Sequence, residues 1–361
     1  LSKGMGKLFF ENNRIIFRRG EDMNRAKNIA KSYNIQKFAD AQTQTTLLPG
    51  LSAQMKTYYE LSLLDNAEPN LVHNQFGDEY DIPKRGGKTI EFRKYDPLPK
   101  ALTPITEGVT PKGNKLNVTT VTATVAQYGD YIQLSDMLDL TAIDNNLVES
   151  TTLLGSQAGR TLDTVTREVL NGGTNVLYAP IDNGDGTFTT VTSRGELNAK
   201  AKLSTKLFFK AAALLKGNNA GYINDSYVAI IHPYAAYDLM TSDGWIDVHK
   251  YATPENIYEG EIGKIGKVRF VESSEAKIAD GGAGGAKVFC TIVLAAHAYG
   301  KTKIKEGGLK HIVKQLGYGD DPLDQRSSSG WKATHVAKRL CEAFMIRIES
   351  GSEFSADADV N

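Results

Sequence analysis

The chain has 361 residues, and its 42 lysines and arginines balance 42 aspartates and glutamates, so the formal net charge is zero. A chain of this length can fold as two domains, or as one domain with long excursions. The balanced charge gives no indication of general binding to nucleic acid or to a membrane surface. No apolar run reaches the roughly 20 residues that span a bilayer, and no signal-peptide pattern stands at the front. We therefore expect a soluble protein, intracellular at synthesis.

Residues 1–50 are predicted to form an N-terminal arm. Residues 1–22 have little periodicity, and two interpretations stay open: a genuine basic tail, or untranslated message read as protein, with Met23 as the true start. The stretch after Met23 carries only positive charges before Asp40, namely Arg25, Lys27, Lys31 and Lys37. Such a stretch is typical of a solvated terminus. A helix is expected next, from Ser52 to Leu64, within a segment of helix and loop over 51–87.

An extended arm is predicted over 88–134. Its outgoing strand, Lys88 to Tyr95, alternates apolar and charged side chains, as a half-buried strand does. Prolines and glycines interrupt the pattern between Asp96 and Asn114. A returning strand is expected from Val118 to Leu134, with a slip in parity near Thr119 that suggests a bulge. The arm would then be a ribbon with a proline-stiffened tip, which is marginal in water unless another surface covers it.

A long helix is predicted directly after this arm. Apolar residues recur every three or four places from Ile143 to Leu170, and Asn171-Gly172-Gly173 ends the pattern. At about 1.5 Å per residue such a helix is roughly 40 Å long. Ser150, Thr161 and Glu168 fall on the heptad seam, which favours a spine packed across a sheet over a coiled coil.

The rest of the chain alternates short helices and strands, which predicts an α+β fold. The expected elements are a hairpin over 176–191, helices over 203–215 and 233–240, strands over 227–231, 267–272 and 288–294, and a last segment over 331–349 before a polar tail from Ser350. Trp245 is expected in the core of this region.

One pattern suggests an enzyme. The stretch Ala295-Ala-His-Ala-Tyr-Gly-Lys-Thr302 loosely fits a phosphate-binding loop, in which Lys301 and Thr302 would bind the nucleotide of a hydrolase. However, Ala295 replaces the first glycine, and no helix pattern follows to aim its N-terminus at a phosphate. A strand end followed by a hairpin is the favoured interpretation.

Other patterns do not support a catalytic, cofactor or metal site. Asp182 to Gly186 lacks calcium ligands at the third and twelfth places, and the glycine-rich Asp280 to Gly285 leads into a strand instead of a helix. The 6 histidines are scattered without ligand spacing, and Cys290 and Cys341 form no CxxC pair. We expect no catalytic, cofactor-binding or metal-ligating residue, and a reducing compartment.

Several phrases of the sequence resemble the major capsid proteins of tailed bacteriophages. They are Thr46-Leu-Leu-Pro-Gly-Leu51, Arg85-Gly-Gly-Lys-Thr-Ile-Glu-Phe92, Leu102-Thr-Pro-Ile-Thr-Glu-Gly108, Tyr128-Gly-Asp-Tyr-Ile-Gln-Leu-Ser-Asp136, His232-Pro-Tyr-Ala-Ala-Tyr-Asp-Leu239 and Gly260-Glu-Ile-Gly-Lys-Ile-Gly266. The resemblance covers the chain from about Met23 to Glu349. It implies the Hong Kong 97-type fold, with an N-terminal arm, an extended loop, a peripheral domain containing a spine helix, and an axial domain.

The resemblance also implies a division of the chain. The expected segments are 1–50 as the N-terminal arm, 51–87 as helix and loop, 88–134 as the extended loop, 135–202 as the peripheral domain with its spine helix over 143–170, 203–271 as the axial domain, 272–349 as further axial and returning peripheral strands, and 350–361 as a polar tail.

The function implied by the resemblance is assembly without catalysis. Copies would form hexamers and pentamers of an icosahedral head that encloses DNA without sequence-specific binding, first in the host cytoplasm and then in the virion. Scaffold, portal or decoration proteins would be further partners. Expected contacts between subunits are Arg93, Leu98, Leu102, Ile105 and Glu107. The hydrolase, a non-viral encapsulating shell protein and a decoration protein remain alternatives.

Overall fold

The computed structural model describes residues 10–11, 14–15, 63, 66–67, 71–81, 87–95, 98–111, 113–141, 146–242, 245, 261–304 and 308–361. The chain divides into two units, residues 1–57 and 58–361. In the first unit, β1 (Phe10–Glu11) pairs with β2 (Arg14–Ile15). The basic stretch after Met23 lies outside the described residues. So does the predicted helix over 52–64, apart from Leu63, which is helical and buried.

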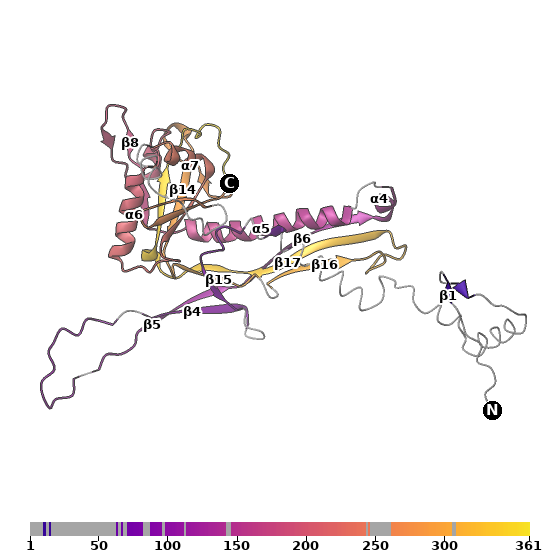
Figure 1. Ribbon diagram of the computed structural model, residues 1–361, viewed down its shortest axis with the longest axis horizontal. Coiled ribbons are helices and arrows are strands. Elements are labelled where there is room, and N and C mark those ends of the chain that lie inside the picture. Colours follow the sequence, from indigo (N-terminus) through magenta and orange to yellow (C-terminus); the bar gives the residue numbers. More distant parts are fainter. Residues whose placement is uncertain are drawn as a thin grey trace, which may run out of the picture. The chain divides into compact units, whose positions relative to one another are not determined.

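The second unit contains a main sheet, which has seven strands among the described residues (Figure 1). Its order is β11 (Glu261–Ile265), β12 (Val268–Glu272), β10 (Tyr227–Ile231), β14 (Val288–Leu294), β19 (Met345–Ser350) and β7 (Val176–Tyr178), and β13 (Ile278–Ala279) pairs with β14. Every residue of β10 and β14 is buried, which explains their nearly continuous apolar sequences. The strands predicted over 227–231, 267–272 and 288–294 are confirmed.

Two helices cover one face of the main sheet. They are α6 (Thr205–Gly217) and α7 (Pro233–Met240), which confirms both predicted helices. Proline at the first position suits the start of α7, and the His232 side chain accepts a hydrogen bond from the Tyr234 amide. Trp245 is buried with its ring 5.4 Å from Phe270, as expected for a core residue.

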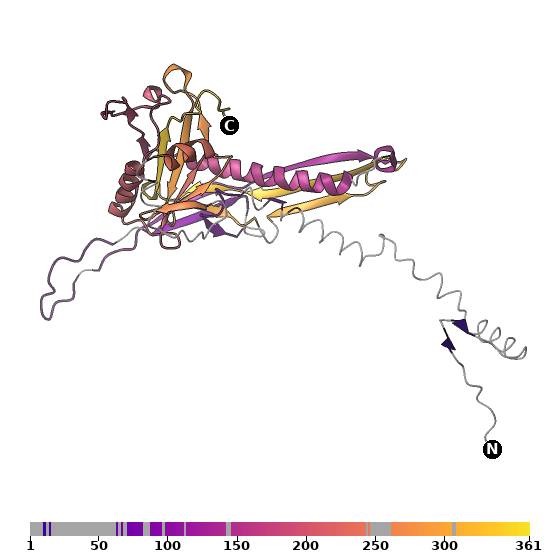
Figure 2. The same ribbon diagram turned by 45° about the horizontal axis from the view of Figure 1, so that its top comes forward.

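The predicted spine is α5 (Asn146–Asn171), preceded by the short α4 (Asp136–Thr141). It runs along a three-stranded sheet, called here the spine sheet, of β16 (Leu309–Lys314), β17 (Arg326–His335) and β6 (Ala126–Ser135) (Figure 2). Leu154, Ala158 and Leu162 of α5 pack against Trp331 and Ala333 of the spine sheet. Burial of this apolar stripe, and not helix propensity alone, stabilises so long a helix.

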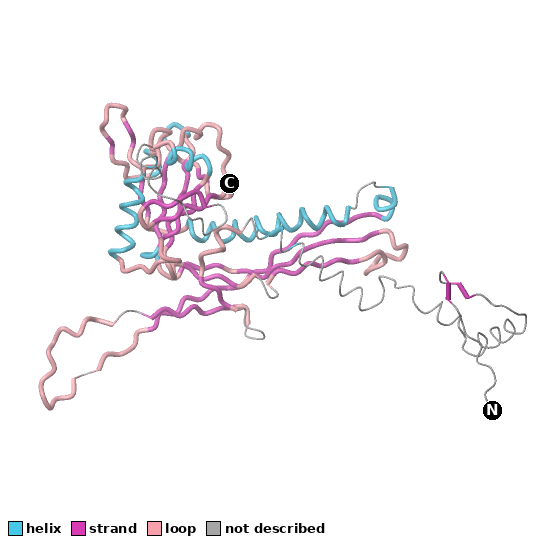
Figure 3. Tube along the Cα trace, viewed as in Figure 1, coloured by secondary structure: helices cyan, strands magenta, loops and turns pink. Residues whose placement is uncertain are grey.

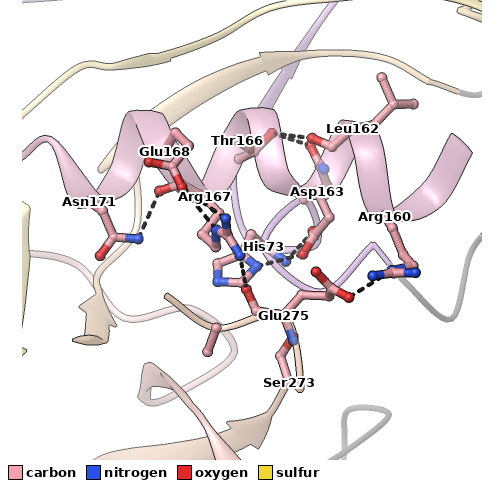
Figure 4. A network of polar contacts seen from close by, with 12 residues as sticks. His73, Arg160, Leu162, Asp163, Thr166, Arg167, Glu168, Asn171, Ser273 and Glu275 are labelled. Atoms are coloured by element: carbon pink, nitrogen blue, oxygen red, sulfur yellow. Dashed lines mark hydrogen bonds and ion pairs between the residues drawn. The ribbon is translucent and has the colours of Figure 1, made fainter. Parts of the chain in front are cut away.

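Buried polar contacts fix the spine on its other side (Figure 4). Asp163 accepts hydrogen bonds from the His73 amide at 2.7 Å, and its second oxygen lies 2.6 Å from His73 Nδ1. Arg167 donates to the Glu275 carbonyl at 2.7 Å. The side chains of Asp163, His73 and Arg167 are all buried. Their polar contacts therefore fix the rotation of α5 about its own axis.

The extended arm differs from its prediction in one respect. β4 (Thr89–Tyr95) pairs with β5 (Val118–Thr124) from Thr89–Thr124 to Tyr95–Val118 without a register shift, so the bulge expected near Thr119 is absent. The single returning strand over 118–134 is also wrong. The chain breaks at Val125, whose amide donates to the Lys88 carbonyl, and β6 then joins β17 in the spine sheet.

Two shorter segments also depart from expectation. Residues 176–178 form β7 of the main sheet, so the predicted hairpin over 176–191 is reduced to β8 (Ile181–Asp182) and β9 (Phe188–Thr189). The segment over 331–349 is divided among the end of β17, β18 (Ala337–Arg339), η4 (Glu342–Phe344) and β19. The remaining short elements are β3 (Asp78–Tyr80), β15 (Tyr299–Thr302), η2 (Arg194–Glu196) and η3 (Ala283–Gly285).

Candidate assembly surfaces

The base of the extended arm is attached firmly to the second unit. Phe92 of β4 is only 1% exposed, and its ring meets Tyr80 edge to face with the centroids 4.7 Å apart. Gly300 leaves room for it, because a Cβ at that position would lie 2.8 Å from the Phe92 ring. Ile90 and Ala123 are buried in the same cluster. The arm therefore starts from a packed base and not from a free hairpin.

The arm tip, described over residues 98–111 and 113–116, is a loop between the two strands (Figure 3). Its large apolar side chains are exposed, with Leu98 at 58%, Leu102 at 82% and Ile105 at 75%. Its backbone contacts are local, such as Val109 N to Thr106 O at 3.2 Å. Apolar side chains gathered in this way mark interaction sites on soluble proteins.

All five predicted contact residues are exposed in the structure. Leu98, Leu102, Ile105 and Glu107 share the exposed tip, and Arg93 lies on the exposed side of β4. Sequence reasoning omitted two further apolar residues of the tip, Val109 and Leu116, which are 62% and 72% exposed. Their place in the same proline-interrupted stretch would have identified them.

A second surface, which sequence reasoning missed, is the open face of the spine sheet. Alternation along the strands turns Trp331 and Ala333 toward α5 and leaves Tyr131 and Ile312 on the opposite face. There they line a groove of about 710 Å³ together with Tyr318 from the loop after β16. Tyr131 is 63% and Tyr318 66% exposed, and the Lys314 ammonium lies 4.4 Å from the Tyr318 ring centroid. The described part of the chain places no helix over this groove.

One glycine of the spine sheet, Gly330, explains the shape of this surface. Gly330 of β17 lies opposite Tyr131 of β6, and a Cβ on Gly330 would come within 2.7 Å of the Tyr131 Cβ. The aromatic side chain therefore stands beside a strand position that cannot carry a side chain of its own. The result is a shallow hollow with an aromatic wall.

The stretch that loosely fits a phosphate-binding loop has a structural role. Lys301 lies in β15, nearly buried, with its ammonium 2.9 Å from Glu79. Thr302 Oγ1 lies 3.1 Å from His335 Nδ1 and accepts the Val336 amide at the same distance. β15 pairs with β3 and β18, so its backbone donors serve the sheet. The strand end is confirmed, but the hairpin expected after it is wrong, because among the described strands β15 pairs with neither β14 nor β16.

Other candidate chemistry is sparse in the described residues. They contain no cluster of three or more His, Cys, Asp or Glu side chains placed to hold a metal ion. No helix in the described part of the chain is long and apolar enough to cross a bilayer. Cys290 and Cys341 are both free and buried, and burial raises the pKa of Cys290 to about 11, which disfavours a reactive thiolate.

A family model described as phage capsid protein matches residues 118–340, which is more than half of the chain, so this chain belongs to the phage capsid protein family. That match includes β5, the spine and most of the main sheet. Its role is that of a major capsid protein of the tailed-phage type, a structural subunit that assembles with copies of itself into the head shell of the virion.

Solved structures agree on the fold. The capsid of the cyanophage P-SCSP1u superimposes with a TM-score of 0.58 at 15% identity, covering 78% of this chain and 88% of that chain. The capsid of Ralstonia phage GP4 gives 0.58 at 16% identity, with 76% and 85% covered. The cyanophage Pam1 capsid gives 0.57 at 14%, with 75% and 86% covered. No curated protein sequence matches the chain. The predicted α+β capsid fold is confirmed.

Proposed function

We propose that the subunit forms hexamers and pentamers of an icosahedral head and that the arm tip of each copy binds the open face of the spine sheet on a neighbouring copy. The exposed tip carries this proposal. Leu98, Leu102 and Ile105 are 58% to 82% exposed on a loop whose base is packed. In a monomeric protein these apolar side chains would remain exposed to water, whereas a neighbouring copy can bury them.

The open face fits the tip chemically. Tyr131, Ile312 and Tyr318 offer exposed apolar surface within the groove, and burying one leucine side chain contributes about 1.5–3 kcal/mol. Ordering the tip costs part of this gain, so one contact is weak. A closed shell makes the same contact many times, and the weak contacts then stabilise the assembly together.

The same proposal covers the domains and partners. The axial domain would be the main sheet with α6 and α7, and the peripheral domain would be α5 with the spine sheet. Assembly would take place in the host cytoplasm. Scaffold, portal or decoration proteins would join the shell, and the DNA inside would be enclosed without sequence-specific contacts, consistent with the zero net charge.

The decisive variant replaces the apolar tip residues by serine: Leu98→Ser, Leu102→Ser and Ile105→Ser together. The matched control changes Thr103 and Thr106 of the same exposed loop to alanine. We expect the control to form shells like the wild type, and the serine variant to remain as free subunits or capsomers by electron microscopy and light scattering. A serine variant that assembles into shells of normal yield and stability would refute the proposal.

A wider deletion, of residues 98–111, tests the whole tip in the same assay. Particle images of the expressed protein also separate a phage-type head from a non-viral encapsulating shell or a decoration protein, because size and symmetry differ. The hydrolase alternative predicts ATP or GTP binding that is lost in Lys301→Ala. The ion pair of Lys301 with Glu79 supports the opposite expectation, which is no nucleotide binding in either protein.

A further inference from the structure

Charges around the main sheet are segregated along the chain. The segment between Glu196 and Asp225 has five basic residues and no acidic one: Lys200, Lys202, Lys206, Lys210 and Lys216. The segment after Ile348 has four acidic residues and no basic one: Glu349, Glu353, Asp357 and Asp359. Opposite charge blocks on a chain of zero net charge indicate two surfaces of opposite sign.

The basic surface is the outer side of α6, called here the lysine face. Leu207, Phe208, Ala211 and Leu215 turn inward to the core, so Lys206, Lys210 and Lys216 point outward. None of these three ammonium groups forms an ion pair with a described carboxylate. Phe209 and Leu214 lie among them and are 50% and 42% exposed. The lysine face therefore combines free positive charge with apolar surface.

The acidic surface is the C-terminal segment, residues 353–361, called here the acidic tail. It is held in place, because Ser355 and Ala358 are buried and the Asn361 side chain binds the Ile278 amide and the Ala276 carbonyl. Asp357 and Asp359 are exposed between these anchors and form no ion pair with a described cation. Val360 beside them is 45% exposed.

Three other charges of the two blocks are paired within the subunit, whereas Lys200 is exposed and forms no ion pair with a described carboxylate. Lys202 pairs with Glu353 at 3.2 Å, and the buried Glu349 pairs with Arg194. Within the two blocks, the unpaired charges are therefore Lys200, the three lysines of the lysine face, and Asp357 and Asp359 at the end of the acidic tail. In both Figure 1 and Figure 2, α6 stands at one edge of the main-sheet region and the C-terminus at the opposite edge.

Two different surfaces at opposite edges suit a head-to-tail contact between identical copies. Such a contact closes into a ring when the rotation between neighbours is a simple fraction of a turn. We propose that the lysine face of one copy binds the acidic tail of the next copy within a ring, with Phe209 and Leu214 meeting Val360. This rests on the hexamers and pentamers proposed above, and it assigns their internal contact to residues remote from the arm tip.

The charges would set register and partner choice more than total affinity. Exposed ion pairs contribute little individually, whereas like charges placed opposite each other are strongly disfavoured. Nucleic acid is the competing partner for a lysine face, since phosphate contacts need only exposed cations. A nucleic acid, however, would leave the complementary acidic tail without a partner.

The test uses charge reversal in the full-length chain. One variant carries Lys206→Glu, Lys210→Glu and Lys216→Glu, so both of its surfaces are acidic. A second carries Asp357→Lys and Asp359→Lys, so both of its surfaces are basic. A third carries all five substitutions, which restores opposite signs with the polarity exchanged. The third variant is the matched control, because it contains every change made in the other two.

Native mass spectrometry and light scattering at about 50 mM salt measure ring formation. We expect each of the first two variants to form rings at least about tenfold less readily than the wild type, and the third to regain most of the loss. Mixing the first two should yield six-membered rings of alternating composition. Five-membered rings cannot alternate completely, so they should be depleted. At about 500 mM salt the differences should shrink.

Several results would overturn this inference. One is unchanged ring formation by either single-surface variant. Another is a five-substitution variant that stays as defective as its parents although its melting temperature matches the wild type. A third is a lysine-face variant that loses binding to double-stranded DNA while its rings form normally. Failure of the arm proposal is distinguishable, because the serine variant of the tip would then form shells whatever the charge variants do.

Discussion

The stability of the subunit should depend on the protonation of His335. This side chain is 1% exposed, with Nδ1 3.1 Å from Thr302 Oγ1 and Nε2 3.0 Å from Thr166 Oγ1. Thr166 donates its own proton to Asn74 and so accepts from Nε2–H. Thr302 accepts the Val336 amide, which leaves its proton for Nδ1. The neutral ring therefore satisfies the whole network, and a proton on Nδ1 would face another proton.

The size of the loss in stability follows from the difference between the pKa of His335 in the folded and in the unfolded chain. Burial, helped by the charge of Lys301, lowers the pKa of His335 from 6.5 to about 4. Between these values the unfolded chain binds the proton and the folded chain does not, so stability is complete above pH 6.5 and is lost as the pH falls toward 4. At about 1.4 kcal/mol for each pKa unit, the loss is about 3 kcal/mol.

The assay compares urea unfolding of the unassembled wild type and His335→Gln at pH 7 and pH 4.5. The variant should be about 1–3 kcal/mol less stable at pH 7, because two buried hydroxyl groups lose a partner. Over the pH change the wild type should lose about 2–3 kcal/mol more than the variant. His232, whose pKa burial also lowers to about 4, is common to both proteins and cancels. Equal losses in the two proteins would refute the reasoning.

Three further predictions concern two packed side chains and one buried carboxylate. Leu162→Ala removes a fully buried side chain of the spine and should lower the free energy of unfolding by about 2–5 kcal/mol, whereas Leu153→Ala, at a 65% exposed position of the same helix, should cost less than about 0.5 kcal/mol; equal costs in urea would contradict the assigned helix face. Glu349→Gln replaces a buried carboxylate that pairs with Arg194 and Arg347 and should cost about 1.5–3 kcal/mol, seen as a lower melting temperature. An unchanged melting temperature would show that these ion pairs add nothing to stability. Phe92→Ala should leave a cavity beneath β4 and lower the free energy of unfolding by about 3–5 kcal/mol. It should also speed hydrogen exchange of the β4–β5 amides. Unchanged exchange rates would mean that Phe92 does not hold the base of the arm.

Local patterns in the sequence were sufficient to predict the elements that bury one continuous apolar stripe or one continuous apolar run. The spine helix was predictable because its apolar residues recur at helical spacing over 26 residues. The strand β10 was predictable because its sequence is a continuous apolar run, as is typical of a strand whose residues are all buried. Pro233 marks the start of α7 for a local reason, since its fixed backbone angle suits a first helical turn.

Strand pairing was not predictable in the same way. The apolar residues fall on odd positions in β5 (Val121, Ala123) and on even positions in β6 (Tyr128, Ile132, Leu134), so the sequence marks a break near Val125. It does not show that the pairing partner changes there from β4 to β17. Likewise, β7 reads as half of a hairpin, although its partner is β19 near the other end of the chain. Long-range pairing is decided by which surfaces need covering, and this information is spread over the whole fold.

One of the two assembly surfaces was predictable from local sequence, and the other depends on long-range strand pairing. The apolar tip was predictable, because prolines stop the strand pattern while Leu98, Leu102 and Ile105 continue to supply apolar surface. The open face of the spine sheet was not, because Tyr131 and Ile312 become neighbours only after β17 has paired with both of their strands.

The most direct test of the central claim is an electron cryomicroscopy map of the assembled shell. The account predicts density for the arm tip, residues 98–116, lying on the open face of the spine sheet of an adjacent subunit, with Leu102 and Ile105 covered. A map in which the tip folds back onto its own subunit, or in which the purified protein forms no particles, would contradict it.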